Sequence, residues 1–308
     1  MPFGRGFFLA LAKSDFLNHR VTKWGFVKRA TRTFMPGEAP EDALAASAVL
    51  AKDGRGSIFT KLGEAIANRD EATAVRDHYL WLFDQIKAQG LPGHVSVKPT
   101  QLGLDIEPGM CQRYTEELAA KAQATGTFLW IDMEDSTYVD RTLALYRAVI
   151  LQYPATGLAM QAYLFRTPKD VNDLLSLKPV IRLVKGAYAE PAHVAYPRKA
   201  DTDRAYYELS DTMLQAAAVG GCLPIFGTHD IALVARIIAR AKELGVPPGK
   251  YEVHMLYGIM DADQERLRAD GQVVKTLISY GNAWFKWYMR RLAERPANVG
   301  FVIRSLLG

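Results

Sequence analysis

Cysteine is nearly absent from this sequence, and the usual spacings of metal-binding residues are missing with it. Only Cys111 and Cys222 occur in 308 residues, too few and too isolated for a disulfide framework or a zinc cluster. The six histidines form no HExxH motif or similar ligand spacing. The sequence therefore predicts no metal site, and its cysteine usage is typical of a protein in the reducing cytoplasm.

Long apolar runs are also absent. No stretch of about 18 uninterrupted apolar residues occurs, so we expect no transmembrane helix. The early segment FFLALA is soon followed by Lys13, Asp15 and Arg20 without a small-residue cleavage site. This pattern favours an amphipathic helix over a signal peptide. We expect a cytoplasmic protein, and peripheral contact with the inner face of the membrane stays open as an alternative.

A strong excess of one charge is lacking as well. The 38 Lys and Arg residues stand against 33 Asp and Glu residues, a net charge of +5, and the basic residues are scattered along the chain. Nucleic acid is therefore not an expected partner, whereas weak attraction to an anionic membrane surface is allowed. No GxGxxG follows a candidate strand, and GxxxxGK(S/T) and GxSxG are missing. Any cofactor must be held by another scheme.

The sequence does contain a repeated alternation of short apolar runs with helical patterns. The runs are SIFTKL (57–62), HVSVK (94–98), FLWIDM (128–133), LAMQAYL (158–164), PVIRLVKG (179–186), LPIFGT (223–228), YEVHML (251–256) and VVKTLIS (273–279). Eight strand-helix units predict an α/β fold, a (β/α)8 TIM barrel, over residues 54–308. Residues 1–53 are predicted to form an N-terminal helical arm that ends at a glycine turn.

Polar side chains are concentrated at or just after the predicted strand ends. They are Lys98, Asp132, Gln161, Arg182, Lys185, Thr228, His229 and His254. Functional groups of such barrels gather at the carboxyl ends of the strands. A buried strand has no structural use for so many polar groups, because each one buried without a partner costs about 1–3 kcal/mol. Their concentration predicts a ligand site.

Each of these segments also has an ordinary structural interpretation. In IRLVKGAY (181–188), the two cations are either ligand contacts or an edge charge followed by a turn glycine. In GTHD (227–230), Thr228 or Asp230 would serve equally well as a helix N-cap, and a lone His229 is more often structural than catalytic.

The acidic segment IDMED (131–135) has similar alternatives. Asp132 is a candidate charge partner for Lys98 or Arg182, while the two following acids begin a solvated loop. Metal binding is disfavoured there because no second carboxylate cluster completes an oxygen shell.

Near the end of the chain, WYMRRLAERPAN (287–298) places two adjacent arginines on a predicted helix. Glu294 lies four residues after Arg290 and three after Arg291, so the three groups reach one corner. Arginine suits a carboxylate ligand because its planar fork makes paired hydrogen bonds and stays charged. Taken alone, however, such a run is more often a solvated helix face with internal ion pairs.

The ordered set VSVK, IDMED, MQAYLFR, IRLVKGAY, GTHD, HML and YMRRLAERPAN resembles the proline dehydrogenase family from about residue 57 to 304. This resemblance implies a distorted (β/α)8 barrel that holds FAD, with a C-terminal substrate-binding helix. It also implies oxidation of L-proline to 1-pyrroline-5-carboxylate by hydride transfer from ring C5 to flavin N5. A membrane quinone is then the expected electron acceptor.

The resemblance assigns roles to individual residues. Asp132 and Arg182 match catalytic residues beside the flavin ring. The implied substrate-binding positions are Lys98, Arg290, Arg291, Leu256, Leu277 and Trp287. The implied cofactor-binding positions are Met133, Gln161, Arg182, Val184, Lys185, Gly186, Ala187, Tyr188, Thr228, His229 and His254, with Glu294 joining the Arg helix to the site.

Several positions depart from the family pattern. Leu277 and Trp287 stand where tyrosines are usual, Thr60 replaces an acid, His254 replaces a glutamine and Asp230 an asparagine. Two alternatives follow: the same chemistry on a modified proline such as hydroxyproline or another cyclic imino acid, and a flavin-binding barrel without turnover. The oligomeric state is not fixed by the sequence, and a homo-oligomer is allowed.

Overall fold

The computed structural model describes residues 34–63 and 66–284. Its strands are β1 (Gly56–Lys61), β2 (Gly93–Val97), β3 (Leu129–Ile131), β4 (Thr156–Gln161), β5 (Val180–Val184), β6 (Leu223–Gly227), β7 (Glu252–Leu256) and β8 (Val274–Tyr280). Its helices are α4 (Pro40–Lys52), α5 (Arg69–Ala88), α6 (Pro108–Thr125), α7 (Val139–Ile150), α8 (Thr167–Leu174), α9 (Lys199–Ala218), α10 (Ile231–Glu243) and α11 (Asp261–Ala269). Short 3-10 helices occupy Pro99–Leu102, Ser136–Tyr138 and Leu175–Leu177.

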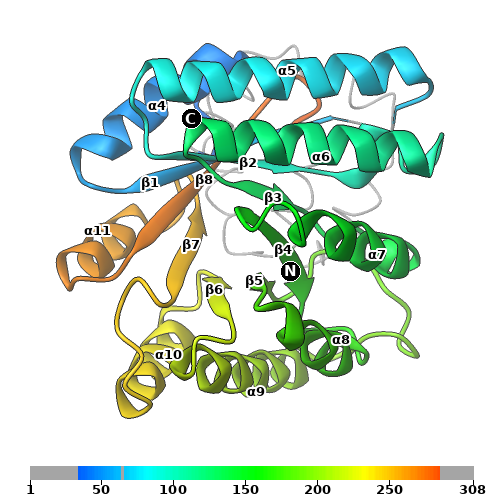
Figure 1. Ribbon diagram of the computed structural model, residues 1–308. Helices are drawn as coiled ribbons and strands as arrows, with labels where there is room; N and C mark the ends of the chain where they lie inside the picture. The colour runs from blue at the N-terminus through cyan, green and yellow to red at the C-terminus, as the bar shows by residue number, and fades with distance from the viewer. Residues whose placement is uncertain (1–33, 64–65, 285–308) are drawn as a thin grey trace, which may run out of the picture.

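The eight strands form a closed parallel barrel in chain order from β1 to β8. The barrel closes through parallel pairing of β1 with β8, in which Ser57 lies opposite Thr276. Helices α5 to α11 surround the strands (Figure 1). The predicted (β/α)8 barrel is confirmed, and each predicted strand overlaps an observed one.

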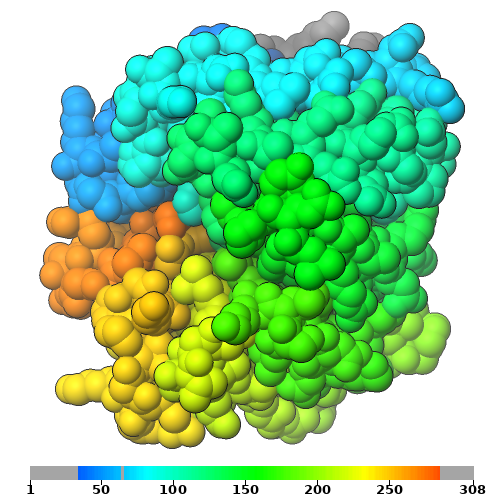
Figure 2. Space-filling model, viewed as in Figure 1, coloured from blue at the N-terminus to red at the C-terminus, as the bar shows by residue number. Residues whose placement is uncertain are grey.

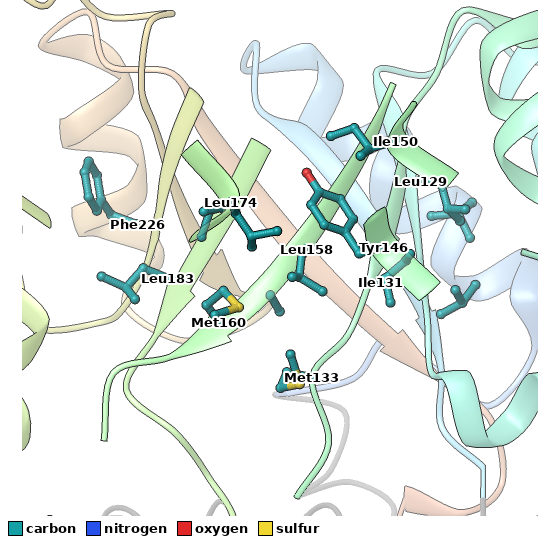
Figure 3. Close-up of a cluster of buried hydrophobic side chains, with 14 of the residues drawn as sticks. Leu129, Ile131, Met133, Tyr146, Ile150, Leu158, Met160, Leu174, Leu183 and Phe226 are labelled. Carbon is teal, nitrogen blue, oxygen red and sulfur yellow. The ribbon is translucent and has the colours of Figure 1, made fainter. Parts of the chain in front are cut away.

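The main hydrophobic core lies between the strands and the surrounding helices. Alternate residues of each strand point outward, so Ile131 of β3 and Leu158 of β4 pack with Tyr146 of α7 in this layer. Figure 3 shows this part of the core, where Tyr146 and Ile150 of α7 and Leu174 of α8 lie near side chains of β3 and β4. Each fully buried side chain of this size contributes roughly 1.5–3 kcal/mol, so the helical ring holds the strand ends in place.

Helix α4 lies against the seam between β1 and β8. Its buried residues Ala43, Leu44 and Leu50 belong to the same core as the barrel helices. The helical character predicted for the N-terminal arm is therefore confirmed for Pro40–Lys52. The division of the chain at residue 53 stays a prediction, and residues 1–33 lie outside the described part.

Figure 2 shows a face of the molecule on which the side chains of the described residues meet without a visible opening through the barrel. This is the expected form of a barrel whose interior is filled with side chains. Within the described part of the chain, no helix has both the length and the apolarity needed to cross a bilayer.

Candidate functional site

Strand alternation brings a polar group to the carboxyl end of the barrel interior. Ser96 on β2 and Trp130 on β3 lie opposite each other in register, and Lys98 and Asp132 follow two residues later on the same faces. The backbone amide of Asp132 donates to the carbonyl of Val97 at 2.9 Å, which keeps the two strand ends side by side. Arg182 reaches the same group from β5.

The Asp132 carboxylate is the centre of this group. Its Oδ1 accepts a short hydrogen bond from Nη2 of Arg182 and a 2.8 Å hydrogen bond from Oγ of Ser96. The same Nη2 donates to Oγ of Ser96 at 3.0 Å. The Lys98 ammonium lies 3.6 Å from Oδ2. Both charge pairings predicted for Asp132 are therefore present.

Arg182 is the most deeply buried charge of the group, with 4% of its surface exposed. Burial lowers the pKa of its guanidinium, and the charge and hydrogen bond of Asp132 oppose that change. An arginine nevertheless stays protonated in a protein. Nitrogen Nη1 is buried and has no hydrogen-bond partner among the described residues. Because an unpartnered buried donor is costly, this nitrogen indicates a ligand position.

Gln161, the last residue of β4, fixes the backbone that follows β3. Its Nε2 donates to the carbonyl of Glu134 at 3.2 Å and contacts that of Met133 at 3.5 Å. The Glu134 carboxylate accepts hydrogen bonds from the amide and hydroxyl of Thr100, and burial raises its pKa. The Oε1 atom of Gln161 is buried without a partner in the described part of the chain, so it offers a ligand an acceptor in addition to the Arg182 donor.

The segment after β5 turns sharply at a glycine. Gly186 has φ +111°, and a Cβ atom there would lie 2.3 Å from the ring of Tyr163. The position therefore requires glycine both for its backbone conformation and for the close approach of the ring. Val184, Gly186, Ala187 and Tyr188 are all half-buried in this segment.

Lys185 does not join the Asp132 group. Its ammonium is bound by Asp203 of α9 at 2.5 Å and by Asp230 at 2.8 Å. These ion pairs tie the turn after β5 to two surrounding helices. The structural interpretation of Lys185 is therefore supported for its side chain, while its backbone stays in the glycine turn.

The GTHD segment ties β6 to its helix and to β7. Oδ1 of Asp230 accepts from the amide of Leu233 at 3.2 Å, which makes Asp230 the N-cap of α10. Thr228 is buried, and its hydroxyl accepts from the Asp230 amide. Nε2 of His229 accepts from the amide of Leu256 at 2.9 Å. The helix-cap interpretation is thus confirmed for Asp230.

His254 and Leu277 lie inside the barrel. Nε2 of His254 donates to Glu252 at 2.9 Å, and Glu252 also accepts from Lys275. Burial lowers the pKa of His254 to about 4, although Glu252 opposes the change. Leu277 pairs with Ile58 and Leu256 in strand register and packs on the small interior cluster that contains Trp130.

Four predicted site residues lie outside the described part of the chain: Trp287, Arg290, Arg291 and Glu294. Their roles stay predictions. Among the described residues, no three His, Cys, Asp or Glu side chains are grouped so that they could hold a metal ion.

Ser96 and Trp130 belong to the site but were not predicted as site residues. Both lie two residues before a predicted site residue, Lys98 and Asp132 respectively, and therefore on the same face of their strands. The period of two was the signal that could have identified them.

The family model and the similar proteins of known function all point to one family. The sequence model of the family described as proline dehydrogenase matches residues 43–304. The chain is 33% identical to proline dehydrogenase 2 of Bacillus subtilis subsp. natto over 306 residues, covering 99% of both chains. It is 34% identical to proline dehydrogenase of Deinococcus radiodurans over 293 residues, covering 94% of this chain and 92% of that one.

Solved structures agree on the fold. Proline utilization A from Bdellovibrio bacteriovorus, in a form inactivated by N-propargylglycine, matches with a TM-score of 0.79 at 23% identity over 87% of this chain. A Bradyrhizobium japonicum proline utilization A variant matches with a TM-score of 0.73 at 23% identity over 90% of this chain. The chain spans about a third of the length of these solved proteins, 33% and 32% respectively.

Proposed function

The chain belongs to the proline dehydrogenase family, and we propose that it oxidises L-proline to 1-pyrroline-5-carboxylate with FAD as its cofactor. The observation that carries this proposal is the group of Lys98, Asp132 and Arg182 at the carboxyl end of the barrel. This group supplies buried positive charge and an unpartnered donor at the place where barrel enzymes bind their ligands.

The described residues fit a flat, hydrogen-bonding cofactor such as the flavin of FAD. Nη1 of Arg182 offers a donor and Oε1 of Gln161 offers an acceptor, both buried and without a protein partner among the described residues. The glycine at position 186 lets the ring of Tyr163 pack against the turn after β5, which fixes the course of this half-buried backbone segment. When bound, FAD supplies the hydride acceptor, and the surrounding charges adjust its electronic properties.

We assign cofactor contacts on the same basis as the sequence prediction. They are Met133, Gln161, Arg182, Val184, Lys185, Gly186, Ala187, Tyr188, Thr228, His229 and His254, with Glu294 as the acid that joins the Arg helix to the site. The ion pairs of Lys185 limit its contribution to the backbone. The hydrogen bond of His254 to Glu252 leaves only its Nδ1 as an acceptor.

The substrate carboxylate is assigned to Lys98 together with Arg290 and Arg291. Lys98 contacts Asp132 at 3.6 Å, longer than a hydrogen bond, so its ammonium hydrogens remain available for an anionic ligand. The ring end is assigned to Leu256, Leu277 and Trp287. These residues hold the amino acid so that ring C5 faces the cofactor, and such positioning can be worth several kcal/mol.

A quinone in the membrane is the proposed electron acceptor, reached by peripheral contact of a cytoplasmic protein with the inner membrane face. The net charge of +5 supports attraction to an anionic surface. A homo-oligomer is compatible with this arrangement.

A modified proline is the second candidate substrate. Leu277 lies in an apolar layer with Ile58 and Ile225. Leucine in place of the tyrosine usual in the family removes a hydroxyl and an aromatic face, which enlarges or reshapes the space around the substrate ring. This substitution favours a different ring preference at an unchanged carboxylate site.

An anaerobic substrate panel tests these proposals together. The purified protein is mixed with L-proline, 4-hydroxyproline or pipecolate, and flavin absorbance is followed. Efficient bleaching by proline alone supports proline as substrate and removes the altered-ring alternative. A yellow protein that no imino acid reduces indicates a binding barrel without turnover. A colourless protein that does not take up FAD contradicts the enzyme proposals.

A further inference from the structure

The indole of Trp130 lies against the buried guanidinium of Arg182. The guanidinium carbon is 4.7 Å from the ring centroid. Trp130 is 1% exposed and Arg182 is 4% exposed, so water does not weaken this cation–π contact. Trp130 lies two residues before Asp132, on the same barrel-interior face of β3.

Trp130 is itself held from three directions. Its Nε1 donates to Nδ1 of His94 at 3.2 Å. Its ring packs on Phe128 with centroids 5.0 Å apart and meets the ring of His254 edge-on at 5.4 Å. A buried indole N–H normally has a hydrogen-bond partner, and here that bond also sets the rotation of the ring. The indole is therefore locked in one orientation before Arg182 rests on it.

The hydrogen bonds of His94 and His254 determine which ring nitrogen of each carries the proton. Nδ1 of His94 accepts a hydrogen bond and so carries no proton. Burial lowers the pKa of His94 well below its usual value, with the nearby Lys275 acting in the same direction. His254 is likewise kept neutral by burial. Two neutral rings beneath Trp130 avoid adding positive charge close to Arg182.

Arg182 is thus constrained by two different contacts. The Asp132 carboxylate and the Ser96 hydroxyl bind its Nη2 atom, which fixes one end of the guanidinium. The indole face fixes the plane in which the guanidinium lies. With one nitrogen and the plane fixed, the direction of the unpartnered Nη1 is also fixed.

We propose that Trp130 is a positioning residue for the redox reaction, which acts by orienting Arg182 so that its unpartnered Nη1 faces the bound cofactor. This inference rests on the proposed function. It predicts that Trp130 influences the cofactor only through Arg182 and does not itself bind the cofactor.

The test is a double-variant comparison in the purified full-length holoenzyme. Trp130→Leu, Arg182→Met and the double variant are compared by the midpoint potential of bound FAD and by kcat and KM. Trp81→Leu, on the outer face of α5, is the matched control for loss of a tryptophan. Trp130→Phe keeps an aromatic face but removes the N–H donor.

We expect Trp130→Leu to lower kcat roughly 30-fold, the size of a desolvated cation–π contact, with a smaller change in KM. Its midpoint potential should shift in the same direction as that of Arg182→Met, and the double variant should match Arg182→Met alone. Trp130→Phe should stay within about threefold of wild type, and Trp81→Leu should match wild type. Additive shifts in the double variant, or an unchanged potential in Trp130→Leu, would overturn the proposal.

A second measurement decides the case in which Trp130→Leu does not fold. The sequence has five tryptophans, and the indole 15N–H signal of Trp130 is the one missing from the spectrum of Trp130→Phe. We expect that signal to move in Arg182→Met because the cation leaves the ring face; an unmoved signal contradicts the contact. If the wild-type protein binds no FAD, the proposed function fails, and the indole signal still reports separately on the Trp130–Arg182 contact.

Discussion

The ammonium of Lys98 lies 3.6 Å from Oδ2 of Asp132. The other carboxylate oxygen is occupied by Arg182 and Ser96, so one aspartate serves two cations through different atoms. Two positive charges on one negative charge leave a net positive group at the carboxyl end of the barrel. Such a group attracts a negatively charged ligand group such as a carboxylate.

Removing the Asp132 charge should destabilise the protein strongly. Asp132→Ala leaves Arg182 buried without a counter-charge, and breaking a buried pair in this way costs about 3–5 kcal/mol. Because 18% of the Asp132 side chain is exposed, we expect the free energy of unfolding to fall by about 3 kcal/mol, as measured by urea unfolding. The control is Asp140→Ala, which removes an exposed pair with Arg166 and should cost less than about 1 kcal/mol. Equal losses would mean that burial does not govern the Asp132 pair.

Replacing Lys98 with methionine should weaken substrate binding. Loss of one charge-assisted contact to a carboxylate corresponds to about 1.5–3 kcal/mol, or roughly a 10- to 150-fold rise in KM. Lys121→Met on the surface of α6, where Lys121 pairs with Asp84, is the control and should leave KM unchanged. An unchanged KM in Lys98→Met would remove Lys98 from the carboxylate site.

Arg291→Met tests the other side of the same proposed clamp. We expect a severe rise in KM while FAD stays bound, because the arginine is assigned to the substrate and not to the cofactor. Substrate titration at fixed enzyme concentration gives KM, and the visible spectrum gives FAD content. Unchanged KM would mean that the Arg pair has been misassigned.

Gly186→Ala should disturb the turn after β5. The added methyl group would lie 2.3 Å from the Tyr163 ring. The turn would also hold the alanine in a backbone conformation that this residue rarely adopts. We expect weakened FAD retention and a lower unfolding temperature. Gly126→Ala also has positive φ but meets nothing within 4 Å, so it isolates the backbone strain, which costs about 1–2 kcal/mol. FAD retention equal in the two variants would contradict the role of close packing at Gly186.

Stability should fall as pH falls from about 6.5 towards 4. Burial lowers the pKa of His254 to about 4 in the folded protein, so the unfolded chain takes up a proton in this window that the folded chain refuses. The groups that face His254 are Glu252, Lys275, Arg182, His94 and Trp130, and the first of them opposes the shift.

Urea unfolding between pH 7 and 4.5 measures this slope. His254→Gln removes the titrating group and should make the slope shallower. The full contribution of His254 between about pH 6.5 and 4 is on the order of 3 kcal/mol, and the measured pH range covers part of it. His78, whose pKa is also lowered to about 4, and His94, whose pKa lies well below its usual value, remain in both proteins and supply the residual slope. An identical slope in both proteins would show that His254 does not resist protonation.

The strands were predictable because parallel strands covered by helices leave uninterrupted apolar runs in the sequence. Polar residues at the predicted strand ends indicated where the site lies, and Lys98, Asp132 and Arg182 meet there as expected. Strand β3 is the largest difference in length, since regular pairing covers only Leu129–Ile131 of the predicted 128–133. The backbone leaves the ladder near Asp132, whose side chain is held by the neighbouring strands.

The use of Lys185 was harder to foresee. Its partners Asp203 and Asp230 come from separate helices, and each has an ordinary place in its own helix pattern. A pairing across three elements depends on the radial positions of helices around the barrel, which sequence periodicity does not specify. The contact between Trp130 and Arg182 joins strands β3 and β5, which are not neighbours, and strand periodicity does not specify which side chains meet across the barrel interior.

The pairing of Ser57 with Thr276 has a consequence for how the protein is made. During synthesis, β1 leaves the ribosome long before β8 exists, so one edge of the growing sheet stays open until nearly the whole barrel has been translated. Open strand edges pair readily with other chains, and contacts between distant segments form slowly. The nascent chain therefore spends most of its synthesis in an aggregation-prone form, and a product that stops before residue 274 keeps that exposed edge.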